Sequence, residues 1–212
     1  MRTTNHLLGL LFMGMFSGLV TGCGHEPKAP GSNQVTINPA IGTTSDKQVP
    51  LGVDKSPMDM AYYPVDYPKL NMSHNNQEPL IARVIYSRPQ KSGRAIFGDV
   101  LKYGNPWRLG ANEATELEFF KDVVIENQKV AKGRYVMYCI PYEDKWTVVL
   151  NNDLYTWGLK IDSTKDAYRF TIPINKTNYP FEFFTMEFDK QGKGAELIVE
   201  WDSVRAKLPF TF

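Results

Sequence analysis

The chain has 212 residues, of which 42% are hydrophobic and 13% aromatic, and its formal net charge is +1. This composition is sufficient for one well-filled core. The near-neutral charge, with no run of like charges, gives no support for a nucleic-acid partner.

The N-terminal segment has the pattern of an export signal. Residues 7–20 form an apolar run, and Val20-Thr21-Gly22-Cys23 closes it. Such a run is short for a membrane span, and its ending resembles the bacterial lipobox, in which the signal is cut before an acylated cysteine. We expect a signal peptide over residues 1–22, lipidation of Cys23, and an exported protein anchored to a membrane of the cell envelope. A plain signal peptide or a single anchor helix is the alternative.

The chain holds two cysteines, Cys23 and Cys139. If Cys23 is lipidated, Cys139 has no partner within the chain, so no disulfide framework is predicted. Cys139 lies in the β-type run of residues 135–140. A buried, unreactive thiol is therefore expected there rather than a nucleophile.

Residues 23–78 are predicted to form a Pro-rich tether. Prolines recur among Ser, Thr, Asn, Gly and Lys with little apolar periodicity, and such a tract buries too little apolar surface to offset the entropy of ordering it. Residues 58–67 are an exception because they contain three tyrosines and two methionines. This segment either packs onto the following domain or forms an adhesive patch within the tether.

Residues 79–212 predict an all-β domain, a single antiparallel β-sandwich of jelly-roll type with long loops. Apolar and polar residues alternate in short runs separated by turn residues, and helical periodicity is confined to a turn or two within residues 96–103. Strands are expected at residues 80–87, 115–120, 123–125, 133–140, 145–151, 167–175, 181–189, 195–201 and 204–212.

The loop of residues 104–115 carries an unusual set of side chains. It contains Trp107, Arg108, Asn112 and Glu113 among two glycines and a proline, just before a strand. Because loops mostly contain small polar residues, this composition predicts either a wedged structural element or a binding surface.

Motifs on both sides of this loop resemble those of an uncharacterised bacterial family called domain of unknown function 2911. The resemblance covers about residues 80–212, and its most specific part is Trp-Arg-x-Gly-Ala-Asn-Glu-Ala-Thr at residues 107–115. Further matching segments are residues 86–89, 93–98, 133–135, 140–141 and 157–158. The resemblance implies an exported, mostly β domain, and it brings no established activity, cofactor or catalytic residue.

Planar cationic and aromatic side chains predict a ligand site near this loop. Arginine forks bind carboxylates or phosphates, and aromatic faces suit sugars and amphipathic anions. The candidate ligand-binding residues are Tyr86, Arg88, Arg94, Trp107, Arg108, Asn112, Glu113 and Trp157. In the alternative interpretation these residues are structural: Arg108 pairs with Glu113, Asn112 caps a turn and Trp107 fills one end of the sandwich.

The sequence predicts no catalytic residue, no metal site and no cofactor. No histidine follows His74, and neither a nucleotide-binding glycine motif nor a calcium-loop spacing is present. A glycosidase acting through Glu113 with Glu116 or Glu118 would need both acids in one cleft.

The resulting functional hypothesis is a membrane-anchored lipoprotein that binds a glycan or a small anionic ligand without catalysis. Its site would lie around Trp107 and Arg108. The alternative is a structural or assembly lipoprotein that docks a protein partner, with the tyrosine-rich segment of residues 58–67 as a candidate docking element. A carboxylate-based glycosidase is the weaker third hypothesis.

Overall fold

The computed structural model describes residues 54–74 and 78–212. The expected signal peptide over residues 1–22, the expected lipidation site Cys23 and the first part of the expected tether, residues 23–53, lie outside the described residues. Within the described ranges, no helix has the length and apolar character that crossing a bilayer requires.

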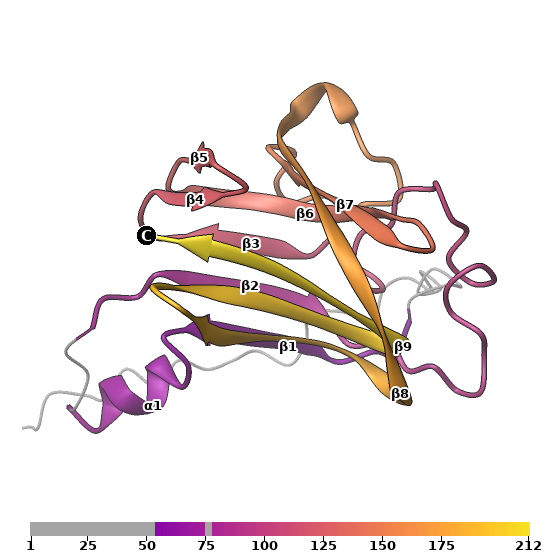
Figure 1. Ribbon diagram of the computed structural model, residues 1–212, viewed down its shortest axis with the longest axis horizontal. Coiled ribbons are helices and arrows are strands. Elements are labelled where there is room, and N and C mark those ends of the chain that lie inside the picture. Colours follow the sequence, from indigo (N-terminus) through magenta and orange to yellow (C-terminus); the bar gives the residue numbers. More distant parts are fainter. Residues whose placement is uncertain (1–53, 75–77) are drawn as a thin grey trace, which may run out of the picture. The chain divides into compact units, whose positions relative to one another are not determined.

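The described residues form an all-β domain, as predicted from the alternating pattern. Nine strands within these ranges make one antiparallel sheet with the order β1-β2-β3-β6-β7-β8-β9-β4-β5 (Figure 1). The strands are β1 Met58–Tyr63, β2 Ala82–Ser87, β3 Glu116–Phe119, β4 Val123–Ile125, β5 Gln128–Val130, β6 Gly133–Pro141, β7 Lys145–Asn151, β8 Asp166–Gln191 and β9 Gly194–Thr211. A short helix, α1 Tyr67–Met72, and a 3-10 turn, η1 Ser163–Lys165, complete the set.

The long strand β8 joins the two layers of the sandwich. Its first part, residues 166–173, pairs with β7, and its later part, residues 174–191, pairs with β9. Register shifts between Lys176 and Thr185 bend the strand. In Figure 1, β8 crosses from the layer of β6 and β7 to the layer of β1 and β9. Sharing one strand between two layers lets the sheet enclose the core.

The core lies between these layers and follows the alternation of the strands. In β9, Val204, Ala206, Leu208 and Phe210 are buried and alternate with residues that are more exposed. A period of two places every second side chain on the core face, which is the pattern that predicted this strand.

The sheet begins earlier in the chain than the pattern indicated. β1 falls within the range expected to be a tether, yet it pairs with β2 along its whole length, from Met58 opposite Ser87 to Tyr63 opposite Ala82. Of the two alternatives for residues 58–67, the structure thus shows the first: β1, which is part of this segment, packs onto the domain. The helical turn considered for residues 96–103 is absent; these residues form a tight turn in which Leu101 donates to the carbonyl of Ile96 at 2.8 Å.

Phe210 should contribute much of the stability of the C-terminal strand. Its ring is 2% exposed and lies 5.4 Å from the ring of Phe119 and 6.1 Å from that of Phe188, whereas Phe212 is 41% exposed. We expect Phe210→Ala to lower the free energy of unfolding by about 3 to 5 kcal/mol, because it leaves a cavity. Phe212→Ala, the matched control, should cost clearly less. Urea denaturation of both variants measures this, and equal midpoints would contradict the assignment.

Candidate functional site

Trp107 anchors the loop of residues 104–115 to the end of the sandwich. Its backbone exchanges two hydrogen bonds with Cys139 of β6, with N–O distances of 2.7 and 2.9 Å. Its ring is buried, stacks on Trp201 at a centroid distance of 5.7 Å and meets Trp146 edge-on at 6.0 Å. Cys139 itself is fully buried, and burial raises the pKa of its thiol well above the ordinary value. The indole therefore has the structural role that one interpretation of the sequence expected.

Buried hydroxyl groups hold the rest of this loop in a fixed shape. Ser87 of β2 donates to the carbonyl oxygen of Ala111 and accepts from its backbone N–H at 2.7 Å. Thr115 donates to the carbonyl oxygen of Leu109 at 2.5 Å. Both hydroxyl residues are completely buried. Because the backbone is satisfied internally, the neighbouring side chain of Arg108 is presented from a rigid support.

Arg108 is half-buried and has no ion pair among the described residues. Its Nη1 donates to the carbonyl oxygen of Trp157 at 3.4 Å, and no described carboxylate lies within ion-pairing distance. Loss of hydration lowers the pKa of its guanidinium, while the charge of Asp54 acts in the opposite direction. The pairing of Arg108 with Glu113, which the structural interpretation expected, does not occur.

Arg94 lies on the neighbouring turn and is oriented by its own loop. Its Nε donates to the carbonyl oxygen of Lys91 at 2.9 Å, and its Nη2 donates to that of Gln90. Within the described ranges it too has no carboxylate partner. These backbone contacts fix the guanidinium without neutralising its charge.

Arg94 and Arg108 line the same pocket, which we call the arginine pocket. Its volume is about 280 Å³. Trp107 and Trp201 contribute to its wall, and Asp54 adds one carboxylate. The remaining wall is mainly apolar and includes Pro89, Val100, Leu101, Pro106 and Leu159. Concave apolar walls with a few charged groups are typical of small-molecule sites.

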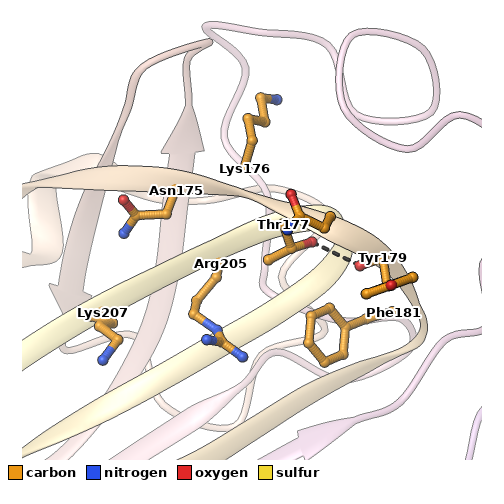
Figure 2. Close-up of a pocket in the computed structure, with 8 residues that line it drawn as sticks. Asn175, Lys176, Thr177, Tyr179, Phe181, Arg205 and Lys207 are labelled. Carbon is orange, nitrogen blue, oxygen red and sulfur yellow. Dashed lines mark hydrogen bonds between the residues drawn. The ribbon is translucent and has the colours of Figure 1, made fainter.

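A second, more open groove differs from the arginine pocket in its charge balance. It measures about 410 Å³, against about 280 Å³ for the arginine pocket, and lies along β8 and β9 (Figure 2). Two of its cations, Arg205 and Lys207, pair with Glu200 and Glu196, and the Arg205 guanidinium lies 5.7 Å from the centre of the Phe181 ring. Lys176 also lines this groove and has no ion pair among the described residues. The groove thus offers one unpaired cation where the arginine pocket offers two, which makes it a weaker candidate for an anion.

Two of the sequence-predicted site residues are used in internal contacts. The Tyr86 hydroxyl donates to the carbonyl oxygen of Met186 at 3.2 Å, and burial raises the pKa of Tyr86 to about 12. Arg88 pairs with Asp59 at 3.1 Å and donates to the Thr185 hydroxyl at 3.2 Å. Neither residue lines the arginine pocket.

Asn112 connects the loop to the segment that precedes β1. Its Oδ1 accepts from the backbone N–H of Asp54 at 2.8 Å, and its Nδ2 donates to the carbonyl oxygen of Asp54 at 2.7 Å. This two-way amide contact places Asp54 at the wall of the arginine pocket. Asn112 thus positions a neighbouring residue instead of capping a turn.

Glu113 and Trp157 line a neighbouring cavity of about 340 Å³, which we call the aromatic pocket. Trp157 is 42% exposed and Tyr155 is 82% exposed, so both rings are accessible. Glu116 also lines this cavity and lies 3.6 Å from Arg134. The predicted residues are therefore divided: Arg94, Trp107 and Arg108 line the arginine pocket, and Glu113 and Trp157 line the aromatic pocket. The other three, Tyr86, Arg88 and Asn112, line neither pocket.

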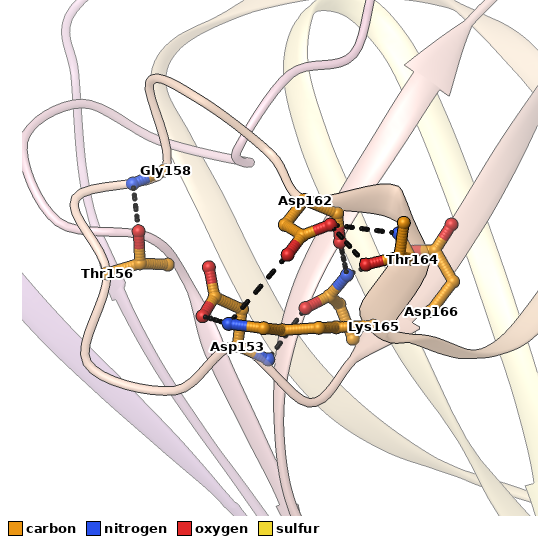
Figure 3. Close-up of polar contacts among 8 residues, drawn as sticks. Asp153, Thr156, Gly158, Asp162, Thr164, Lys165 and Asp166 are labelled. Carbon is orange, nitrogen blue, oxygen red and sulfur yellow. Dashed lines mark hydrogen bonds and ion pairs between the residues drawn. The ribbon is translucent and has the colours of Figure 1, made fainter.

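A polar network secures the loop that carries Trp157 and Gly158 (Figure 3). Lys165 lies 2.6 Å from Asp153 and 3.9 Å from Asp162. The Asn151 side chain donates to the carbonyl oxygen of Asp162 at 2.9 Å. The acids here are occupied by internal partners, and no group of residues suited to hold a metal ion is found within the described part of the chain.

Several residues of the arginine pocket were missed by the sequence analysis. Asp54 comes from the range expected to be a tether, and Trp201 comes from a strand that reads as ordinary core. Leu101 and Leu159 lie in loops without a distinctive pattern. These residues line one pocket only because segments far apart in the sequence pack together, so no local signal in the sequence could have indicated the pocket.

The fold and the pocket define a class: an antiparallel β-sandwich with an arginine-lined pocket beside a fixed loop. The chain matches the family model described as Protein of unknown function (DUF2911) over residues 68–210, and it belongs to this family. Neither the curated proteins nor the solved structures gave a match.

Gly158 should be essential to the placement of Arg108. Its φ is +75°, and an added Cβ would lie 2.9 Å from the Cβ of Ala114 and 3.0 Å from that of Arg108. Gly93 has a similar φ of +72° but open space around the added Cβ, which makes it a matched control. We expect Gly93→Ala to cost about 1 to 2 kcal/mol of stability from backbone strain alone. Gly158→Ala should cost more; equal urea midpoints for the two variants would contradict this.

Proposed function

We propose that this domain binds a small anionic ligand at the arginine pocket without catalysing a reaction. The observation that carries the proposal is the sharing of one pocket by Arg94 and Arg108, neither of which has a carboxylate partner among the described residues. Guanidinium groups recognise carboxylates and phosphates through paired hydrogen bonds, and a partly buried site strengthens them.

The other arginines of the described residues support this interpretation. Each of them pairs with a carboxylate: Arg83, Arg88, Arg134, Arg169 and Arg205. The two that lack such a partner come together in one pocket although fourteen positions separate them in sequence. Placing two guanidinium groups in one pocket with a single carboxylate, Asp54, leaves an excess positive charge, and such an arrangement favours a role in binding anions.

A glycan is the second candidate ligand, and it suits the aromatic pocket better. The exposed rings of Tyr155 and Trp157 offer flat faces, and Glu113 supplies an acceptor beside them. Apolar faces next to a few polar groups are what a sugar requires.

Catalysis by an acid pair has less support, because Glu116 already faces Arg134. Protein docking through residues 58–67 has partial support, because Met58, Met60 and Val65 are exposed there whereas Tyr63 is buried within the sheet.

A thermal-shift assay on the full chain tests the ligand proposal, with benzoate, phosphate and N-acetylglucosamine as probes. A bound ligand at one hundred times its Kd should raise the Tm by roughly 5 to 10 °C. Arg108→Gln and Arg94→Gln should abolish the shift given by an anion. Lys193→Gln, which removes the same charge from an exposed residue outside this pocket, should retain it.

The outcomes of this assay separate the two ligands. A shift given by the sugar alone, and lost in Trp157→Ala, would favour the aromatic pocket. Anion shifts that persist in both arginine variants, or no shift with any probe, would overturn the assignment to the arginine pocket.

We further propose that the domain acts in the bacterial cell envelope, held on a membrane by acyl chains on Cys23. The support is the lipobox-like ending of the apolar run at residues 20–23. Cys23→Ser should move the protein from the membrane fraction to the soluble fraction of the cells that produce it, because several acyl chains give firm anchoring. Cys139→Ser, which changes the buried cysteine, is the control and should leave the protein with the membranes. An unchanged distribution for Cys23→Ser would contradict the anchor.

A further inference from the structure

The charge of the arginine pocket limits the charge of its ligand. Among the described residues, the charged groups that line it are Arg94, Arg108 and Asp54, and together they leave a formal charge of +1. Burial lowers the pKa of Arg108 and the negative charge of Asp54 partly opposes this, so the carboxylate acts on that guanidinium even though the two groups form no ion pair. A monoanion would neutralise the pocket, whereas a dianion would leave an excess negative charge next to Asp54.

The remaining wall of the pocket favours a ligand with an apolar body. The indole rings of Trp107 and Trp201 and the side chains of Leu101 and Leu159 contribute to it. The volume is about 280 Å³. An apolar cavity of about 150 Å³ is large enough for benzene, so a body of about one ring fits together with a charged group.

Hydrogen-bond donors without acceptors are also present at this pocket. Arg108 donates once, through Nη1, and within the described residues its Nε and Nη2 have no acceptor. A carboxylate has two oxygens that can accept from these two free donors of the guanidinium group.

We infer that the arginine pocket takes small monocarboxylates with an apolar body, and that Asp54 excludes dianions. This inference rests on the proposed binding function and specifies its ligand class. Asp54 is suited to set the charge because its backbone is fixed by Asn112, while within the part of the chain that the structure describes its carboxylate accepts only from the N–H and hydroxyl of Ser56. Asp54→Asn therefore removes the charge and leaves the backbone contacts in place.

The test is calorimetric titration of the full chain at pH 8 with four probes. Benzoate has the charge and the ring, benzamide has the ring alone, and acetate has the charge alone. Phenyl phosphate has the ring and is a dianion at this pH, since the second pKa of a phosphate is about 6. Asp54→Asn is compared with the unchanged chain, and Asp189→Asn serves as the control because Asp189 lies outside the pocket.

Benzoate should bind the unchanged chain at least tenfold more tightly than benzamide, acetate or phenyl phosphate. Coulomb energy is proportional to the charge of the ligand, so Asp54→Asn should strengthen benzoate binding by roughly fivefold and phenyl phosphate binding by roughly twentyfold. Asp189→Asn should change neither affinity appreciably.

Two results would overturn the inference about ligand charge and Asp54. They can be told apart from the result that would also overturn the proposed binding function. Tighter binding of phenyl phosphate than of benzoate to the unchanged chain would exclude the monoanion preference, while anion binding itself would stand. Equal effects of Asp54→Asn on both ligands would exclude Asp54 as the selecting residue. If none of the three anions binds, the proposed function fails as well.

Discussion

The burial of Trp107 is the constraint on which the rest of the site depends. Its ring fills the end of the sandwich against Trp146 and Trp201, and its backbone pairs with Cys139 of β6. A large aromatic ring in a close-packed core leaves its loop little freedom. Because Trp107 points inward, the backbone carries the next residue, Arg108, to the rim of the arginine pocket. Structural and binding roles thus belong to adjacent residues of one loop.

Three surrounding segments share in this arrangement. Ser87 of β2 holds the loop from one side, and Asn112 ties it to Asp54. The loop of residues 152–165 approaches from another side, where Gly158 allows contact with Arg108. These contacts satisfy backbone groups and leave the guanidinium fork largely unpaired. A site supported in this way is ready to bind without large rearrangement, which lowers the entropic cost of association.

The sequence predicted the fold class and the importance of the loop, but only part of the site. Alternation of apolar and polar residues is a local signal, so the β6–β7 pair could be read directly. β8 and β9 were each predicted as two shorter strands, because polar and turn-type residues within them interrupt the pattern although the strands continue. β1 was hard to assign because a single short strand among prolines has no convincing period. The loop composition pointed to Trp107 and Arg108, whereas Asp54 and Trp201 reach the pocket only through tertiary packing. Tyr86 and Arg88 were wrongly grouped with the residues of the arginine pocket. The sequence does not reveal which way a side chain at the end of a strand faces, and both make internal contacts.

The most direct test of the central claim is an NMR titration of the arginine side-chain N–H signals of the full chain with benzoate. If the anion binds in the arginine pocket, the signals of Arg94 and Arg108 should show saturable shifts, and those of the five ion-paired arginines should stay largely unchanged. Contradiction would come from signals of Arg94 and Arg108 that do not respond, or from shifts of equal size in the ion-paired arginines. Either result would mean that the unpaired guanidinium groups are not the place where an anion binds.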